Sequence, residues 1–190
     1  MFPMHHPGRC EVIDGCLVVF PAAPPGHHRI AGNLEDALGP ALPAAAVVLP
    51  DTPVRVPGGD GPVPDLLVGT VPEGCLDRAL PAEYVHTAVE VVAPASRYFD
   101  RVRKPELYAE AGIPCYWRVE PEPWRAYRGV VPVIVVRVRA GGRWQVLLAP
   151  AGRTHELPVA VGREPDGEPV TVPVVIDPAR LLDPRLRGLE

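Results

Sequence analysis

Short apolar segments, separated by proline and glycine turns, run through most of the chain. Residues 27–38 carry apolar side chains at helical spacing, and Gly39-Pro40 ends that pattern. Residues 11–20 turn at Asp14-Gly15 and predict a β-hairpin. We expect further strands near residues 46–56, 64–68, 85–92, 115–119, 126–138, 143–148 and 170–176. This order of elements predicts an α/β fold with a mixed central sheet flanked by helices and an added N-terminal hairpin.

A second helix is predicted over residues 101–111, with Gly112 and Pro114 after it as a stop signal. Pro105 fits its first turn, where the missing N–H matters little. One stripe of this helix combines a lysine with apolar side chains: Lys104, Leu107, Tyr108 and Ala111. We therefore expect Lys104 to point inward, near the positive end of the helix dipole, which disfavours its protonated form.

Three charged residues stand where charge is costly or unusual. Lys104 is the only lysine beside eighteen arginines, and lysine differs from arginine in being able to lose its proton when desolvated. Glu90 interrupts a strand apolar enough to be buried on both faces, so its carboxylate needs a cation or a metal. Asp65 opens another short apolar strand. The structural alternatives are a leftover of composition for Lys104, a salt bridge to arginine for Glu90 and a turn for Asp65.

Taken together, the three residues predict a metal-dependent hydrolytic site. Carboxylates that converge from adjacent strands form a hard oxygen site suited to Mg²⁺, for which Mn²⁺ can substitute. Such an ion activates water and neutralises phosphodiester charge, while a nearby lysine stabilises the charge that develops. This combination is typical of nucleases.

The same residues resemble the PD-(D/E)XK nuclease signature, in the variant whose lysine has moved to the following helix. More closely, the chain resembles the Uma-two family of restriction endonucleases. The matching segments, over about residues 9–180, begin at Glu11, His27, Pro64, Val89, Asp100 and Tyr116.

This resemblance implies a restriction-endonuclease-like core, with Asp65 and Glu90 as metal ligands and Lys104 as the catalytic lysine. It adds Glu11, His27 and Asp100 as outer members of the site. The chain departs from the family pattern at Ala93 and Ala95, where relatives usually have serines, and at Cys115, where a polar residue often stands. These departures bear on fine positioning and substrate choice.

Length and composition are consistent with one nuclease-like domain over residues 1–190. The hydrophobic share of 47% is ordinary for a globular chain, and the 27 prolines and 18 glycines are scattered as turns. No apolar run is long enough to cross a bilayer, and the first residues lack a signal-peptide core, so we expect a cytoplasmic protein. The cysteines show no zinc-like spacing and are expected to be reduced, although two could face each other across the hairpin: Cys10, Cys16, Cys75 and Cys115.

The net charge of −4 argues against a DNA-binding role, because DNA binders usually carry a basic surface. Locally, Arg97, Arg101 and Arg103 cluster beside the predicted site and are expected to contact nucleic acid. Arginines and aromatic residues also alternate near residues 117–144, which fits base stacking or a half-solvated sheet.

We expect a DNA substrate, with RNA still open, and a homodimer in which residues 130–136 could form a contact. The alternative is a non-catalytic nuclease-like module for binding or assembly, in which Glu90 and Lys104 form a structural ion pair.

Overall fold

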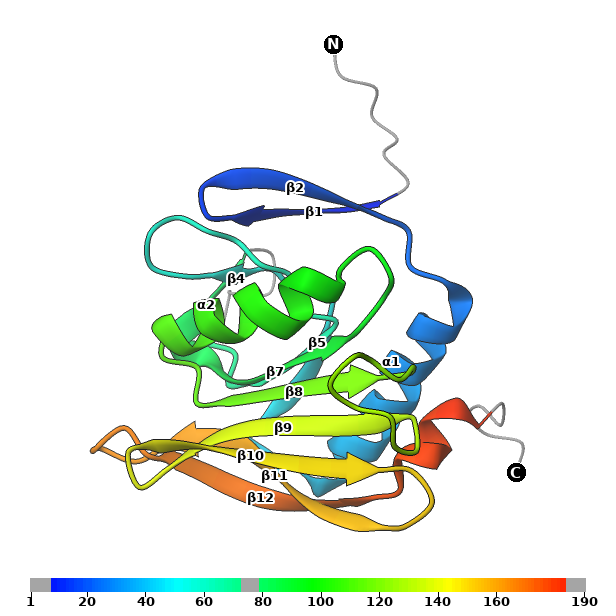
Figure 1. The fold of residues 1–190 in the computed structure, drawn as a ribbon. Helices are drawn as coiled ribbons and strands as arrows, with labels where there is room; N and C mark the ends of the chain where they lie inside the picture. Colours follow the sequence, from blue (N-terminus) through cyan, green and yellow to red (C-terminus); the bar gives the residue numbers. More distant parts are fainter. Residues whose placement is uncertain (1–7, 73–78, 184–190) are drawn as a thin grey trace.

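The computed structural model describes residues 8–72 and 79–183. Its centre is a six-stranded mixed sheet with the strand order β10-β9-β8-β7-β5-β3 (Figure 1). β7 and β8 run parallel, whereas each of the other neighbouring pairs is antiparallel. The strands are β3 (Val47–Pro50), β5 (Leu66–Gly69), β7 (Val85–Val91), β8 (Cys115–Glu120), β9 (Val133–Ala140) and β10 (Arg143–Pro150).

The parallel β7–β8 pair requires a crossover, which is helical, as expected for a βαβ unit. A π-helical turn, Phe99–Arg103, leads into α2 (Lys104–Glu110), and the chain then returns to the sheet as β8. Pro105 lies in the first turn of α2, and Lys104, Leu107 and Tyr108 are buried, which confirms the predicted inward stripe. This crossover brings the lysine over the sheet strand that carries Glu90.

One face of the sheet is covered by α1 (Pro25–Leu38), by a hairpin of β11 (His155–Arg163) and β12 (Pro169–Ile176), and by the short helix Pro178–Leu182. The apolar spacing of α1 predicted this contact, since Ile30, Leu34 and Leu38 are buried in the cluster beneath it. Val89 and Val91 of β7 point to the same side. The face opposite them is therefore left for Glu90.

The other face packs against α2 and a small parallel ribbon of β4 (Val54–Arg55) and β6 (Leu80–Pro81). Beyond α2 lies the N-terminal hairpin of β1 (Gly8–Ile13) and β2 (Cys16–Pro21), as predicted (Figure 1). Backbone bonds between Val12 and Gly61, and an edge-to-face contact of Phe20 with Phe99, attach it to the body. The hairpin thus contributes side chains to the α2 side of the sheet.

Several element boundaries differ from the predicted ones. The expected strand over residues 46–56 is two strands, because Asp51 adopts a positive φ of 43° and turns the chain. β11 was not predicted. The strand expected over 126–138 begins at Val133, and the buried side chains of Val133, Ile134 and Val136 pack in the core. The prediction that this stretch forms a dimer contact is therefore wrong for these three residues.

The hairpin register separates the two cysteines that could have faced each other. Cys10 lies opposite Val19, and Cys16 lies opposite Ile13, so the two thiols do not pair. Both are free and exposed, Cys115 is free and buried, and Cys75 lies outside the described residues. Among the helices within residues 8–72 and 79–183, none has the length and apolar character needed to span a membrane.

Candidate active site

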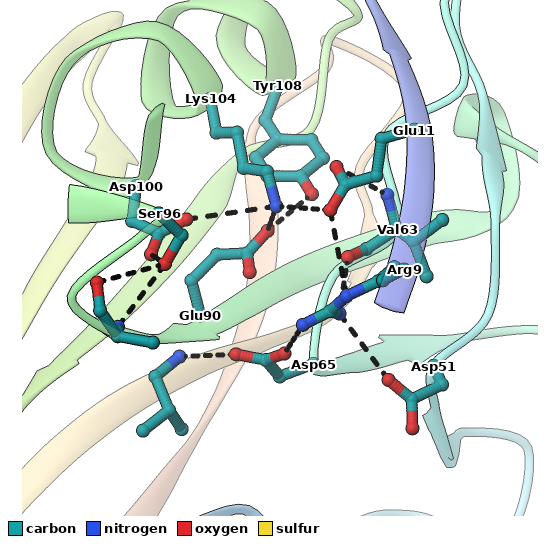
Figure 2. Close-up of polar contacts among 12 residues, drawn as sticks. Arg9, Glu11, Asp51, Val63, Asp65, Glu90, Ser96, Asp100, Lys104 and Tyr108 are labelled. Carbon is teal, nitrogen blue, oxygen red and sulfur yellow. Dashed lines mark hydrogen bonds and ion pairs between the residues drawn. The ribbon is translucent and has the colours of Figure 1, made fainter. Parts of the chain in front are cut away.

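Lys104 is the centre of a buried polar cluster between α2, β7 and the N-terminal hairpin (Figure 2). Its Nζ lies 2.9 Å from Oε1 of Glu90 and 3.0 Å from Oε1 of Glu11, and the residue is 1% exposed. The Tyr108 hydroxyl, one helical turn further along α2, donates to the same Glu90 oxygen at 2.8 Å. The pairing of Glu90 with Lys104, which the sequence suggested, is thus direct.

Glu11 reaches the cluster from β1, and its two oxygens have different partners. Oε1 accepts from Lys104, while Oε2 accepts the backbone N–H of Val63 at 3.1 Å. The residue is 2% exposed. The hairpin is therefore connected to the cluster by a buried ion pair and a buried hydrogen bond.

Asp65 lies immediately before β5, next to the strand that carries Glu90. The antiparallel register pairs Leu66 with Val89, so one further step along it places Asp65 opposite Glu90 on the same face. The Val91 backbone N–H donates to Asp65 Oδ2 at 2.7 Å, which ties the carboxylate to β7. The two predicted metal ligands are thus neighbours across two strands.

The carboxylate of Asp65 is held by cationic and histidine partners. Its Oδ1 accepts from the Arg9 guanidinium, and its Oδ2 lies 3.0 Å from His27 Nε2, at the start of α1. Burial raises the pKa of Asp65, but the hydrogen bond from His27 and the charge of Arg9 outweigh it and lower the pKa to about 2. Asp65 is therefore ionised at neutral pH.

Asp100, in the π-helical turn before α2, completes the acidic set. Its Oδ2 accepts from the Ser96 hydroxyl, and its Oδ1 lies 3.8 Å from Lys104 Nζ and has no hydrogen-bond partner. Burial raises the pKa of this carboxyl to about 6, although Lys104 and Ser96 oppose that shift. Tyr116 fixes the turn, since its hydroxyl donates to the Asp100 carbonyl oxygen at 2.7 Å.

The charge state of Lys104 is the opposite of the one expected from the helix dipole. Burial lowers its pKa, but the nearby carboxylates of Glu90, Glu11 and Asp100 raise it well above the usual value. Lys104 is therefore protonated at neutral pH. For Glu90, burial raises the pKa well above its ordinary value, and the charge of Lys104 only partly opposes that effect.

The chemistry of this cluster fits a divalent cation. Four buried carboxylates, those of Glu11, Asp65, Glu90 and Asp100, face the two cations Arg9 and Lys104, which leaves two negative charges uncompensated when all are ionised. Burial is the main cause of the raised pKa values of Glu90 and Asp100, and the neighbouring carboxylates add to it. Magnesium and manganese prefer such hard oxygen donors.

In the described part of the chain, no three acidic, histidine or cysteine side chains are arranged to hold an ion as they stand. The reason is that the oxygens of Asp65 point to Arg9 and His27, and Oε1 of Glu90 points to Lys104 and Tyr108. A cavity of about 450 Å³ opens beside the cluster and is lined by Glu90, Glu11, Asp100, Lys104 and Arg9. The acidic cluster is therefore reachable from one side.

The three arginines predicted to contact nucleic acid lie outside the cluster and pair with acids. Arg97 donates to Glu122 at 2.8 Å, and Arg103 lies 2.7 Å from Asp14 on the hairpin. Arg101 makes two bonds, 2.8 and 2.7 Å long, to the buried carboxylate of Glu120. Their contact with nucleic acid stays a prediction.

Sequence reasoning missed Arg9, Ser96 and the role of Tyr108. The signal for Arg9 was its spacing from Glu11, since residues two apart on a strand share a face. Tyr108 had been placed on the inward stripe, but as an apolar residue. Ser96 and Asp100 lie four residues apart, a spacing that suits one face of a helix, yet no feature of the sequence showed that a helical turn would begin near Ser96.

Comparisons with known proteins agree with this fold. The family model described as "Putative restriction endonuclease", Uma2, matches residues 2–171. No curated protein matches the chain. A solved structure with a similar fold, "Crystal structure of a putative nuclease belonging to DUF820 from Anabaena variabilis ATCC 29413", has a TM-score of 0.64 and 13% sequence identity, over 83% of this chain and 84% of that one. The match of the family model over residues 2–171, most of the chain, shows that the chain belongs to the Uma2 restriction endonuclease family.

Proposed function

We propose that the protein is a cytoplasmic, divalent-metal-dependent endonuclease that hydrolyses phosphodiester bonds in DNA. In this proposal Asp65 and Glu90 hold Mg²⁺, or Mn²⁺ in its place, and Lys104 assists the attack of water. The observation that carries it is the contact of Lys104 with Glu90 at 2.9 Å, buried but bordering an open cavity, with Asp65 opposite Glu90 on the adjacent strand. Membership of the restriction endonuclease family supports the reaction class.

The residues of the chain divide the work. A bound divalent ion would supply acidification of water and neutralisation of phosphate charge. Lys104 is held protonated by its carboxylate neighbours, so it would act as a hydrogen-bond donor to a charged oxygen and not as a base. Tyr108 orients Glu90, and His27 orients Asp65, through the hydrogen bond and close contact described above. Glu11 and Asp100 hold the lysine from its other sides.

Substrate and assembly extend the proposal. The cluster of Arg97, Arg101 and Arg103 lies on the segment that leads into α2, and phosphate groups could replace its present acidic partners. A DNA duplex has two strands to cut, which a two-fold homodimer would serve with its two sites. RNA is the alternative substrate, so a cleavage assay should test it beside DNA.

A second candidate is a non-catalytic nuclease-like module for binding or assembly. The observation in its favour is that Glu90 and Lys104 already form a buried ion pair with each other. Under this alternative, the ion pair would have a structural role alone. A loss of stability on removing Lys104 does not separate the two candidate functions. Under either one, the substitution leaves buried carboxylates without their cation.

Cleavage and metal-dependent melting together separate them. Purified protein is incubated with supercoiled plasmid, linear DNA and RNA in Mg²⁺ or Mn²⁺, beside the isosteric variants Glu90→Gln and Asp65→Asn. The nuclease proposal expects cleavage by the unaltered protein, slowed about 100-fold or more in both variants. It also expects the ion to raise the Tm, and Asp65→Asn to remove that effect. Absence of cleavage by the unaltered protein, matching both variants, together with a Tm indifferent to the ion, would favour the structural module.

A further inference from the structure

Arg9 occupies the space beside Asp65 that a shared metal ion would need. Its guanidinium donates to Asp65 Oδ1 and to the Val63 carbonyl oxygen at 2.8 Å, and its Nε lies 3.7 Å from Glu11 Oε1 (Figure 2). Arg9 lines the 450 Å³ cavity together with Glu90, whereas Asp65 does not border it. Asp65 instead lines a separate hollow of about 130 Å³ that also includes His27. The guanidinium thus lies between one predicted ligand and the cavity that the other borders.

The two cations of the cluster differ in how easily they can leave it. The Lys104 side chain is 1% exposed and touches carboxylates on three elements. The Arg9 side chain is 26% exposed and lies at the edge of the cavity. A long side chain with part of its length at the surface can rotate outward without unfolding its strand. Arg9 is therefore the cation that can be displaced.

An acceptor for the displaced guanidinium is already in place. Asp51 Oδ1 lies 3.4 Å from Arg9 NH1, and its side chain is 69% exposed, on the solvent side of the cluster. The positive φ of Asp51 sets this turn between β3 and β4. An outward rotation would let Arg9 keep Asp51 while releasing Asp65.

We infer that Arg9 is a resident cation of the site, which competes with the divalent ion for Asp65 and moves toward Asp51 when the ion binds. The inference rests on the proposed metal-dependent function. It assigns to the N-terminal hairpin control over metal loading, because the hairpin carries both Arg9 and Glu11. Without the guanidinium, the Asp65 carboxylate would be open to an ion from the cavity that borders Glu90.

The test is a calorimetric titration that measures the affinity of the purified protein for Mn²⁺ in the absence of nucleic acid. Arg9→Gln removes the charge but keeps an amide donor for Asp65. We expect this variant to bind Mn²⁺ about tenfold more tightly than the unaltered protein, because a unit charge adjacent to the ligand is gone. Arg139→Gln is the matched control, since Arg139 pairs with Glu168 far from the cluster, and it should leave the affinity unchanged.

Three results bear on the inference in different ways. Tighter binding by Arg9→Gln alone supports it. Equal or weaker binding by Arg9→Gln overturns it, while Mn²⁺ binding by the unaltered protein leaves the proposed function standing. Failure of both proteins to bind Mn²⁺ overturns the inference and the metal-dependent function together.

A second variant covers the case in which Arg9→Gln does not fold. Asp51→Asn weakens the outer acceptor and should lower Mn²⁺ affinity about threefold, the order expected for an exposed ion pair. Where Arg9→Gln does fold, Asp51→Asn should have no effect in that background, because no guanidinium remains to move. Unchanged affinity in Asp51→Asn overturns the inference.

Discussion

Replacing Lys104 with methionine tests the buried cluster most sharply, because methionine fills a similar volume and removes only the ammonium. At an effective dielectric constant of about 20, each ion pair near 3 Å contributes roughly 5 kcal/mol before desolvation. Desolvation of the ammonium offsets much of this, so the net cost of losing it is expected to be about 3 to 5 kcal/mol. The carboxylates of Glu90 and Glu11, at 2.9 and 3.0 Å, would lose their cation.

Urea unfolding at pH 7.5, in the presence of a chelator, measures the cost of Lys104→Met as a change in the free energy of unfolding. In the Glu90→Gln background, Lys104→Met should cost about 1 to 3 kcal/mol less, since one of its carboxylate partners is already neutral. Arg139→Met removes a cation from a half-exposed pair with Glu168 and should cost less than about 1 kcal/mol. A cost for Lys104→Met no larger than that of Arg139→Met would show that the buried ion pairs do not stabilise the fold, and strict additivity with Glu90→Gln would show that Lys104 and Glu90 are not coupled.

Three further predictions concern stability. The pKa of Asp100 is raised to about 6 from the ordinary value of 3.8, so the unaltered protein loses stability as pH rises through 6. Urea unfolding in the presence of a chelator should therefore show Asp100→Asn to be about 3 kcal/mol more stable than the unaltered protein at pH 8, and equally stable near pH 4. Asp65 has a lowered pKa of about 2, so its contribution of roughly 2 kcal/mol is present above pH 3.8, and Asp65→Asn should lose it at pH 7 but not near pH 2. Gly69→Ala would bring a Cβ to 2.5 Å from the Tyr84 carbonyl oxygen and should therefore lower the Tm. Gly32→Ala lies in α1 with open space around it and should raise the free energy of unfolding by about 0.5 to 1 kcal/mol, so equal Tm shifts for the two variants would contradict this prediction.

Local patterns predicted the parts of the fold that depend on neighbouring residues. The apolar run of β7 and the inward stripe of α2 follow from periodicity, and both were placed correctly. β11 was missed because Pro158 and Gly162 interrupt it, and its register shifts between Ala160 and Gly162. Such a strand is defined by its partner β12 more than by its own sequence.

The site divides in the same way. The placement of Lys104 beside Glu90 could be predicted, because a buried acid and an inward lysine lie only 14 residues apart and are linked by one crossover. Arg9 could not be assigned to Asp65, since 56 residues separate them and the contact depends on how the hairpin docks. The charge of Lys104 also depends on Glu11, which arrives from that hairpin. Long-range packing therefore determined both features.

Anomalous diffraction from crystals soaked in Mn²⁺ is the decisive test of the proposed metal site, since it locates the ion itself. We predict one strong peak between the carboxylates of Asp65 and Glu90, with the Arg9 guanidinium moved toward Asp51. A peak at a different place in the molecule, or a soaked cluster in which Arg9 still bonds Asp65 and no ion is bound, would contradict it.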